Sequence, residues 1–226
     1  AGNSPWPDAY APETLRLAAV VSRLRGDYAQ AATFADEAAM LAAEISDRWP
    51  AAVGFARKEQ GYLLLLAYPE DAARAAEVVR LGLAHWPPKL YPAERENAIR
   101  DMSLYYLAAG DDNAAREVIQ TLVAAPMTPE ALERNIGYGL AELCRIFLAF
   151  PPENRPKPFA TWMSRALELA PQAITAHWNT VRMALEQKDD AAAMRHLQEL
   201  YALSDHPQQM AGTLQSLMEA FPDRTV

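Results

Sequence analysis

Cysteine is nearly absent from this chain of 226 residues, which contains Cys144 alone. One cysteine excludes an internal disulfide and a thiolate metal cluster, so an apolar core has to stabilise the fold, and the chain is long enough to bury one. Valine (9) and isoleucine (6) are also few, whereas alanine (45) and leucine (26) are abundant. This balance favours helices over the β-branched residues that populate sheets, and it argues against an all-β or a parallel α/β fold.

Long apolar runs are also missing. The longest uncharged apolar stretch, residues 61–68, is far shorter than the roughly 20 residues that cross a bilayer. We therefore expect a soluble segment with no membrane span. A single cysteine is compatible with both the cytoplasm and the periplasm, and the sequence leaves the compartment and the oligomeric state open.

Positive charge is scarce and scattered. The chain has 21 lysine and arginine residues against 29 aspartate and glutamate residues, a formal net charge of −8. Nucleic-acid binding requires clustered basic residues, so we expect no nucleic-acid partner.

Signatures of catalysis and of metal binding are missing as well. No two of the four histidines stand three to five residues apart, and there is no glycine-rich phosphate loop. Cys144 lies in an apolar helical stretch, where a small core residue is expected. The pairs Asp111-Asp112 and Asp189-Asp190 fall at breaks between helical stretches, where aspartate caps a helix N-terminus. We expect no catalytic residue, no cofactor and no metal, and an enzyme on a helical-repeat scaffold is the least favoured alternative.

The sequence contains a repeat instead. Five times, a helical stretch is followed by a short polar break, a second helical stretch and a proline. The predicted helical hairpins span about 13–47, 52–85, 93–125, 129–170 and 173–204. We expect an extended lead-in over 1–12, a single domain over 13–226, and a C-terminal capping helix at about 207–220.

Two proline-rich connectors interrupt this pattern. Residues 86–92 are predicted to pack between the second and third hairpins or to contact a partner. Residues 151–158 are long for a hairpin turn. This connector could form a lip over a groove, mark a subdomain boundary or be an inserted surface loop.

The first hairpin resembles the tetratricopeptide repeat family. The run from Gly26 to Ala31 followed by Ala38 is similar to the family's turn and to the two small residues of its second helix. Gly61, Gly137 and Trp178 stand where the first helix of the family carries glycine or tryptophan. The resemblance implies an all-α fold, a right-handed superhelical solenoid of about five hairpins closed by the capping helix.

The resemblance also implies a binding groove. Arg16, Lys58, Arg100 and Arg134 take similar places on four successive first helices, the helices that line the concave face in this family. Amphipathic and amide side chains at or near the same positions complete the candidate site, namely Tyr62, Tyr138, Asn135 and Asn179. The alternative is that these cations are merely solvated, balanced by the nearby acids Glu13, Glu59, Asp101 and Glu133.

We therefore expect a non-catalytic scaffold that binds an extended, acidic segment of a protein or peptide partner in its concave groove. The alternative is a regulatory or docking domain of a larger protein, such as a membrane-anchored envelope assembly factor. The absence of an initial methionine motivates that alternative.

Overall fold

A computed structural model describes residues 7–203 together with Gly212, Leu214, Gln215 and Glu219. Within this part the chain is all-helical and has no β-strand. The ten α-helices are α1 (Pro7–Leu24), α2 (Tyr28–Glu44), α3 (Ala52–Ala67), α4 (Ala72–His85), α5 (Pro92–Ala108), α6 (Asp112–Gln120), α7 (Pro129–Phe147), α8 (Phe159–Leu169), α9 (Ile174–Glu186) and α10 (Asp190–Leu203). Two short 3₁₀ helices, η1 (Pro69–Asp71) and η2 (Pro152–Asn154), precede α4 and α8. None of the described helices is long and apolar enough to span a membrane.

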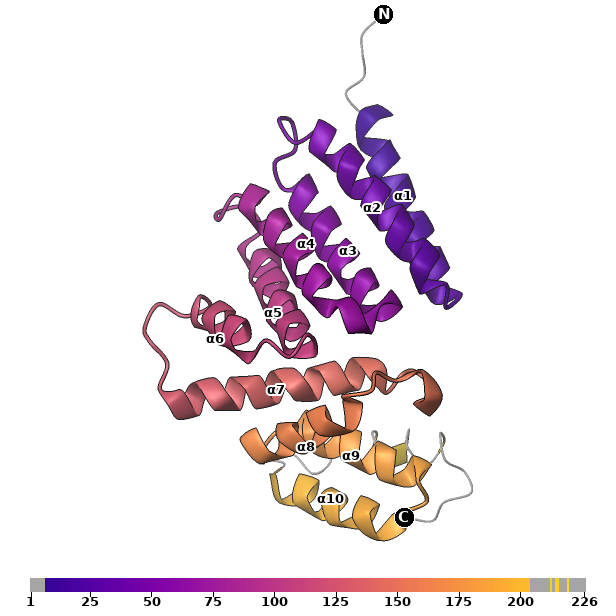
Figure 1. Cartoon of the computed structure of the whole chain (residues 1–226), viewed down its shortest axis with the longest axis vertical. Coiled ribbons are helices and arrows are strands. Elements are labelled where there is room, and N and C mark those ends of the chain that lie inside the picture. Colours follow the sequence, from indigo (N-terminus) through magenta and orange to yellow (C-terminus); the bar gives the residue numbers. More distant parts are fainter. Residues whose placement is uncertain (1–6, 204–211, 213, 216–218, 220–226) are drawn as a thin grey trace, which may run out of the picture. The chain divides into compact units, whose positions relative to one another are not determined.

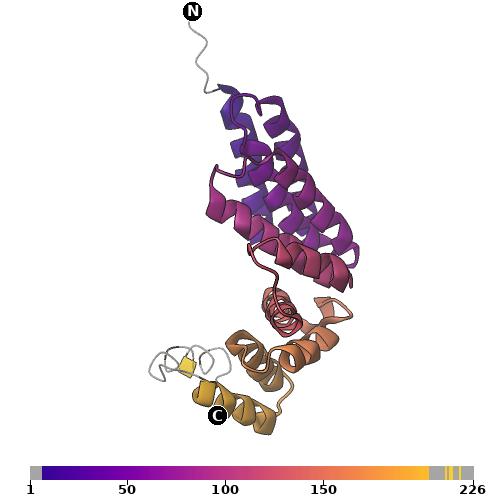
Figure 2. The same ribbon diagram turned by 90° about the vertical axis from the view of Figure 1, so that its left-hand side faces the viewer.

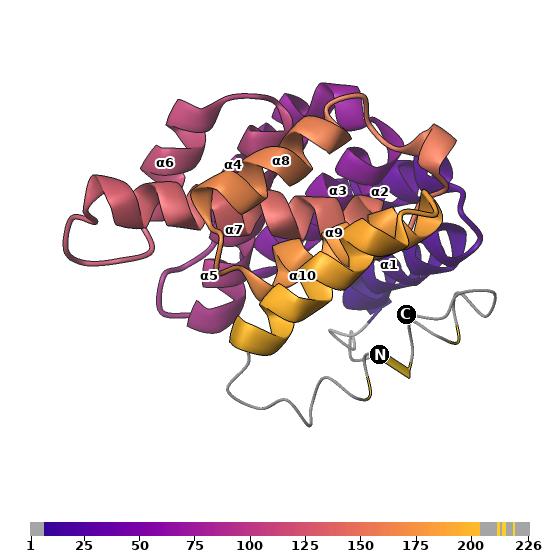
Figure 3. The same ribbon diagram turned by 90° about the horizontal axis from the view of Figure 1, so that it is seen from below.

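The chain divides into two compact units, Ala1–Met127 and Thr128–Val226. In unit 1 each of the helices α1 to α5 packs against the next one, the last of them being α6, and α3 also packs against α5 (Figures 1 and 2). In unit 2, α7 packs against α8 and α9, and α10 packs against α9 (Figure 3). The division falls at Met127, which differs from the boundary considered at the connector 151–158.

The helices lie close to their predicted ranges, with two differences. Residues 7–12 are helical rather than extended, because Pro7 occupies the first helical position, where no backbone N–H is needed, and the helix tolerates Pro12. Helix α6 ends at Gln120, five residues before the predicted end, because the N–H groups of Thr121 and Leu122 bond to carbonyls three residues back rather than four, and the Gln120 side chain bonds to residues further on. This side chain donates to the Ala125 carbonyl at 3.1 Å and accepts from the Met127 N–H at 2.9 Å. The predicted cap at 207–220 lies outside the described residues apart from the four isolated positions named above.

Three of the hairpin turns have the same construction. In the first, Gly26 has φ +80° and its N–H bonds to the Arg23 carbonyl at 2.9 Å, while the Asp27 N–H reaches the Ser22 carbonyl at 2.9 Å. This closes α1 with a Schellman motif, and the Asp27 carboxylate then accepts from the Gln30 N–H at 3.1 Å to begin α2. Asp111 and Asp189 cap α6 and α10 in the same way, at 3.0 and 2.9 Å. The prediction that these aspartates cap helices is confirmed.

Small residues allow the helices of each unit to approach closely. The buried face of α2 consists of alanines, Ala31, Ala32, Ala35, Ala38, Ala39 and Ala42. In α3, a Cβ on Gly61 would lie 2.5 Å from Cγ2 of Val79 in α4. In unit 2, a Cβ on Gly137 would lie 2.7 Å from the Cβ of Ala170. Glycine is therefore required at both positions by packing.

Both proline-rich connectors are anchored to their own unit. Trp86 is 2% exposed, its Nε1–H donates to the Leu90 carbonyl at 2.8 Å, and its ring lies 4.6 Å from that of Phe55. The connector 86–92 thus packs within unit 1 on α3. In unit 2, Arg155 fixes the connector 151–158 to α9 by hydrogen bonds to Glu186.

Candidate functional site

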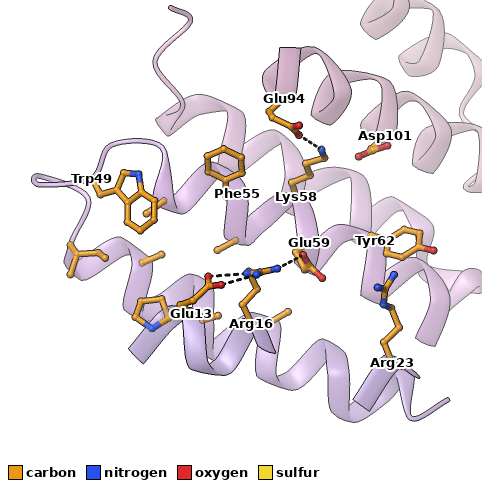
Figure 4. A pocket seen from close by; sticks show the side chains of 17 residues that line it. Glu13, Arg16, Arg23, Trp49, Phe55, Lys58, Glu59, Tyr62, Glu94 and Asp101 are labelled. Carbon is orange, nitrogen blue, oxygen red and sulfur yellow. Dashed lines mark hydrogen bonds and ion pairs between the residues drawn. The ribbon is translucent and has the colours of Figure 1, made fainter. Parts of the chain in front are cut away.

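Unit 1 contains a pocket of about 560 Å³ (Figure 4). Its walls come from α1, α2, α3 and α5 and from the turn before α3. The lining residues are Pro12, Glu13, Arg16, Arg23, Ala35, Ala38, Ala42, Ile45, Trp49, Ala52, Phe55, Ala56, Lys58, Glu59, Tyr62, Glu94 and Asp101. The volume falls in the range of ordinary ligand pockets.

Apolar side chains line one part of the pocket. Ala35, Ala38 and Ala42 come from the alanine face of α2, and their spacing places them on one side of that helix. Their small side chains leave the space open, because a larger residue at any of these positions would fill it. Trp49, which is 43% exposed, and Phe55 add aromatic surface beside the alanines.

Arg16 is held by two carboxylates at the edge of the pocket. Its Nε and Nη2 donate to Glu13 at 2.9 and 2.7 Å, and Nη1 lies 3.9 Å from Oε2 of Glu59 (Figure 4). The hydrogen bonds from Arg16 hold the pKa of Glu13 below its usual value. Glu13 lies three residues before Arg16 on α1, whereas Glu59 belongs to α3, so the pairing ties the two helices together.

Lys58 is also paired. Its Nζ donates to Oε2 of Glu94 at 2.9 Å, which joins α3 to α5, and this bond lowers the pKa of Glu94. Two members of the predicted basic ladder therefore have carboxylate partners before any ligand binds. An acidic ligand would have to compete with those partners.

Arg23 differs from Arg16 and Lys58. Its guanidinium carbon lies 5.8 Å from the centre of the Tyr62 ring, a cation–π contact between α1 and α3. The Nε atom of Arg23 is buried and has no hydrogen-bond partner. Arg23 lines the pocket and adds a formal positive charge to this end of it, which favours a ligand with an acidic group.

The structure brings together three of the eight predicted site residues. Arg16, Lys58 and Tyr62 line the pocket. Arg100 is exposed and lies outside the lining, although it is on the same helix as Glu94 and Asp101. The ladder interpretation thus finds two of its four cations in this pocket.

The other four predicted residues belong to unit 2. Arg134 is exposed, and the exposed Tyr138 accepts a hydrogen bond from Nε2 of Gln172 at 3.2 Å. Asn135 donates to the Ala131 carbonyl at 2.8 Å within α7. Asn179 is 4% exposed and donates to the Ala141 carbonyl at 2.7 Å, so it joins α9 to α7 as part of the core.

Sequence reasoning missed Arg23, Trp49 and Glu94. Arg23 stands seven residues after Arg16, two helical turns along the same face, and this spacing was a usable signal. Glu94 is 36 residues from Lys58, and only the packing of α5 on α3 brings them together.

The lining of the pocket carries three formal positive charges and four negative ones. The cations are Arg16, Arg23 and Lys58, and the acids are Glu13, Glu59, Glu94 and Asp101. The pocket is thus close to charge balance rather than positive.

Two further observations concern the cysteine and the metal-binding side chains of the described residues. Burial raises the pKa of the Cys144 thiol to about 12, so this group stays protonated at neutral pH. Across the described residues, no group of three or more histidine, cysteine, aspartate or glutamate side chains is arranged to hold a metal ion.

No protein-family model matches this sequence, and no curated protein or solved structure proved similar to it. The function has to be argued from the site itself.

Proposed function

We propose that unit 1 is a non-catalytic protein-binding module whose pocket receives an extended segment of a partner protein. The observation that carries the proposal is the combination of an alanine and aromatic surface with the positively charged side chain of Arg23 in one pocket of about 560 Å³. The apolar part accommodates an aliphatic or aromatic side chain. The end of the pocket near Arg23 accommodates a carboxylate of the partner, so the proposed preference for acidic segments depends on Arg23.

The tetratricopeptide-like arrangement is part of the same proposal. Contacts between α3 and α5, and between α7 and α9, support a stacking of first helices within each unit, as in a solenoid of hairpins. Gly61 and Gly137, at the positions of the first-helix glycine of that family, each face a neighbouring helix or its end too closely for a Cβ. In this arrangement α1, α3 and α5 supply most of the charged rim of the pocket.

The ion pairs at the rim set the expected selectivity. Arg16 and Lys58 are engaged by Glu13, Glu59 and Glu94, so a ligand carboxylate gains least from them and most from Arg23. We infer that the partner segment carries one acidic group near one apolar side chain, rather than a run of acidic residues. A run of acidic residues would meet four carboxylates in the lining.

A peptide-display selection tests the proposal. Random linear peptides are selected on the 226-residue protein, and the enriched peptides are then measured by fluorescence anisotropy. Arg23→Gln is expected to weaken binding about tenfold, the loss of one charge-assisted contact. Ala38→Phe, which fills the apolar part, is expected to abolish binding.

Matched controls use exposed arginines that lie outside the lining of the pocket. Arg25→Gln changes an exposed arginine two residues from Arg23, and Arg100→Gln changes a ladder residue that lies outside the lining. Both are expected to bind the peptides as the unmodified protein does. Peptides that bind Arg23→Gln and Ala38→Phe with full affinity, while both variants retain their helical circular dichroism, would rule out this pocket.

A further inference from the structure

Two histidines far apart in the sequence meet between α9 and α10. Nδ1 of His177 lies 3.0 Å from Nδ1 of His196, and the two ring centres are 5.2 Å apart. Nε2 of His177 lies 2.7 Å from the Pro171 carbonyl oxygen. His177 is 6% exposed, whereas His196 is partly exposed.

These distances determine where the protons are. A carbonyl oxygen only accepts, so Nε2 of His177 carries a hydrogen and donates it to Pro171. In neutral His177 the other nitrogen, Nδ1, is then an acceptor. The contact of 3.0 Å between the two Nδ1 atoms therefore requires that His196 carries its hydrogen on Nδ1 and donates it to His177.

The pair can accept one further proton without losing this bond. If Nε2 of His196 is protonated, Nδ1–H of His196 still donates to His177. If both rings are protonated, each Nδ1 carries a hydrogen, and two donors with like charge face each other at hydrogen-bond distance. The doubly protonated pair is incompatible with the observed contact.

We propose that His177 and His196 form an acid-sensitive latch that holds α10 against α9 at neutral pH and releases it when both imidazoles are protonated. The latch acts within unit 2 and is independent of the function proposed for unit 1. The two histidines are held differently. His177 is hydrogen-bonded to the Pro171 carbonyl, whereas His196 lies on α10, the last continuous helix of the described part.

The groups around His196 favour its neutral form, which agrees with a latch that opens at low pH. Desolvation, then the charges of His177 and Arg195, hold the pKa of His196 below its usual value of 6.5, and Glu199 opposes them. Within the described part, none of the charges that act on His196 comes from α7 or α8, the other helices that pack on α9. A histidine whose pKa is lowered on folding stabilises the closed form above pH 6.5, and this contribution is lost as the pH falls below that value.

A metal ion is a weaker explanation of the same geometry. Protein metal sites with imidazole ligands use three or four side chains, and the described residues place no third ligand beside this pair. The hydrogen bond accounts for both Nδ1 atoms without an ion.

The first measurement is imidazole NMR on the ¹⁵N-labelled protein at pH 7.5. The expected spectrum shows His177 as the Nε2–H tautomer and His196 as the Nδ1–H tautomer. Two Nε2–H tautomers would overturn the proposal, because neither Nδ1 would then carry the hydrogen that the contact requires.

The second measurement is amide hydrogen exchange between pH 7.5 and pH 5, expressed as protection factors so that the intrinsic effect of pH cancels. The open pair can bind two protons and the closed pair at most one, so protection of α10 is expected to fall below about pH 6.5, by between tenfold and about a hundredfold per pH unit at the steepest point. Amides of α7, which does not carry the pair, are expected to change less.

The variant His196→Gln separates the latch from general acid destabilisation. Glutamine can donate to His177 or accept from it, and it does not titrate in this range. Protection of α10 in this variant is expected to become independent of pH between 7.5 and 5. His85→Gln, the same substitution at an exposed histidine of unit 1, is expected to retain the pH dependence. A flat profile in the unmodified protein, or an unchanged slope in His196→Gln, would overturn the proposal.

Discussion

Arg155 donates hydrogen bonds from both terminal nitrogens to the carboxylate of Glu186, at 2.7 and 2.9 Å, across 31 residues of sequence. The side chains are 8% and 19% exposed, so this ion pair is largely buried. Arg155 also donates to the Phe150 carbonyl at 3.1 Å. One side chain from the middle of the connector 151–158 thus fastens it to both α9 and the residues that follow α7.

Removal of this arginine is expected to destabilise unit 2. Arg155→Ala leaves Glu186 partly buried without its bidentate partner, which costs about 3 kcal/mol in comparable buried pairs. Urea unfolding followed by circular dichroism measures the loss. The control is Arg145→Ala, which breaks a pair with Glu142 whose side chains are 61% and 40% exposed and should cost less than about 1 kcal/mol. Equal losses in the two variants would contradict this interpretation of Arg155.

Lys188 occupies a position that suits glycine. Its φ of +64° places it in the left-handed region, at the same point of the turn where the other two hairpins carry Gly26 and Gly110. A side chain in this conformation costs about 1 kcal/mol relative to glycine. Lys188→Gly is therefore expected to stabilise the protein by about 0.5 to 1 kcal/mol in urea unfolding, because greater freedom of the unfolded chain offsets part of the gain. Gly26→Ala should have the opposite sign.

The packing of Gly137 predicts a loss of stability on a minimal substitution. Gly137→Ala places a methyl group 2.7 Å from the Cβ of Ala170 and 2.9 Å from its backbone nitrogen, neither of which belongs to a flexible side chain. We expect a cost of about 1 to 3 kcal/mol, despite the better helix propensity of alanine. Thermal unfolding compares this variant with Gly212→Ala, where nothing lies within 4 Å of the added atom. A gain of stability at position 137 would contradict the close approach of α7 to Ala170.

Titration of Glu13 reports on the pocket rim. Because Arg16 lowers the pKa of Glu13 in the folded protein, the carboxylate stabilises the fold above its unfolded pKa of about 4.5, and this contribution disappears as the pH falls through the lower folded value. Carbon-detected NMR is expected to show a Glu13 midpoint below 4.5, and Arg16→Gln should return it toward that value. An unchanged midpoint in the variant would mean that the Arg16 bond does not persist in solution.

Cys144 is expected to resist thiol reagents in the folded protein. A pKa near 12 leaves about a thousandth as much thiolate at pH 8 as an ordinary cysteine has. Modification by Ellman's reagent should therefore be slow in buffer and rapid in denaturing urea. Rapid reaction without denaturant would show that the thiol is accessible.

Much of the helical pattern could be predicted from the sequence because its signals are local. The pair Gly26-Asp27 ends one helix and begins the next through bonds within five residues, and Pro129 after Thr128 opens α7 in the same local way. The premature end of α6 was missed because it depends on where the Gln120 amide finds partners, which helix propensity does not encode.

The candidate site was predictable only in part because it depends on contacts between helices. Similar places on successive first helices identified Arg16 and Lys58, but the identity of their partners depends on the rotation of each helix about its axis. A rotation of one residue turns a side chain by about 100°. Asn179 illustrates the result, since it was predicted to face a groove and instead donates to the Ala141 carbonyl in the core.

The walls of the pocket are contributed by residues from Pro12 to Asp101, on four helices that no single hairpin contains. A molecule bound there contacts the folded unit and has no equivalent site on the unfolded chain. Occupancy is therefore coupled to folding by mass action, and a ligand present at a hundred times its dissociation constant would add about 2.7 kcal/mol to the stability of unit 1. Resistance to heat or to proteolysis would then rise with partner concentration, which makes the lifetime of the unit a measure of how often its pocket is filled.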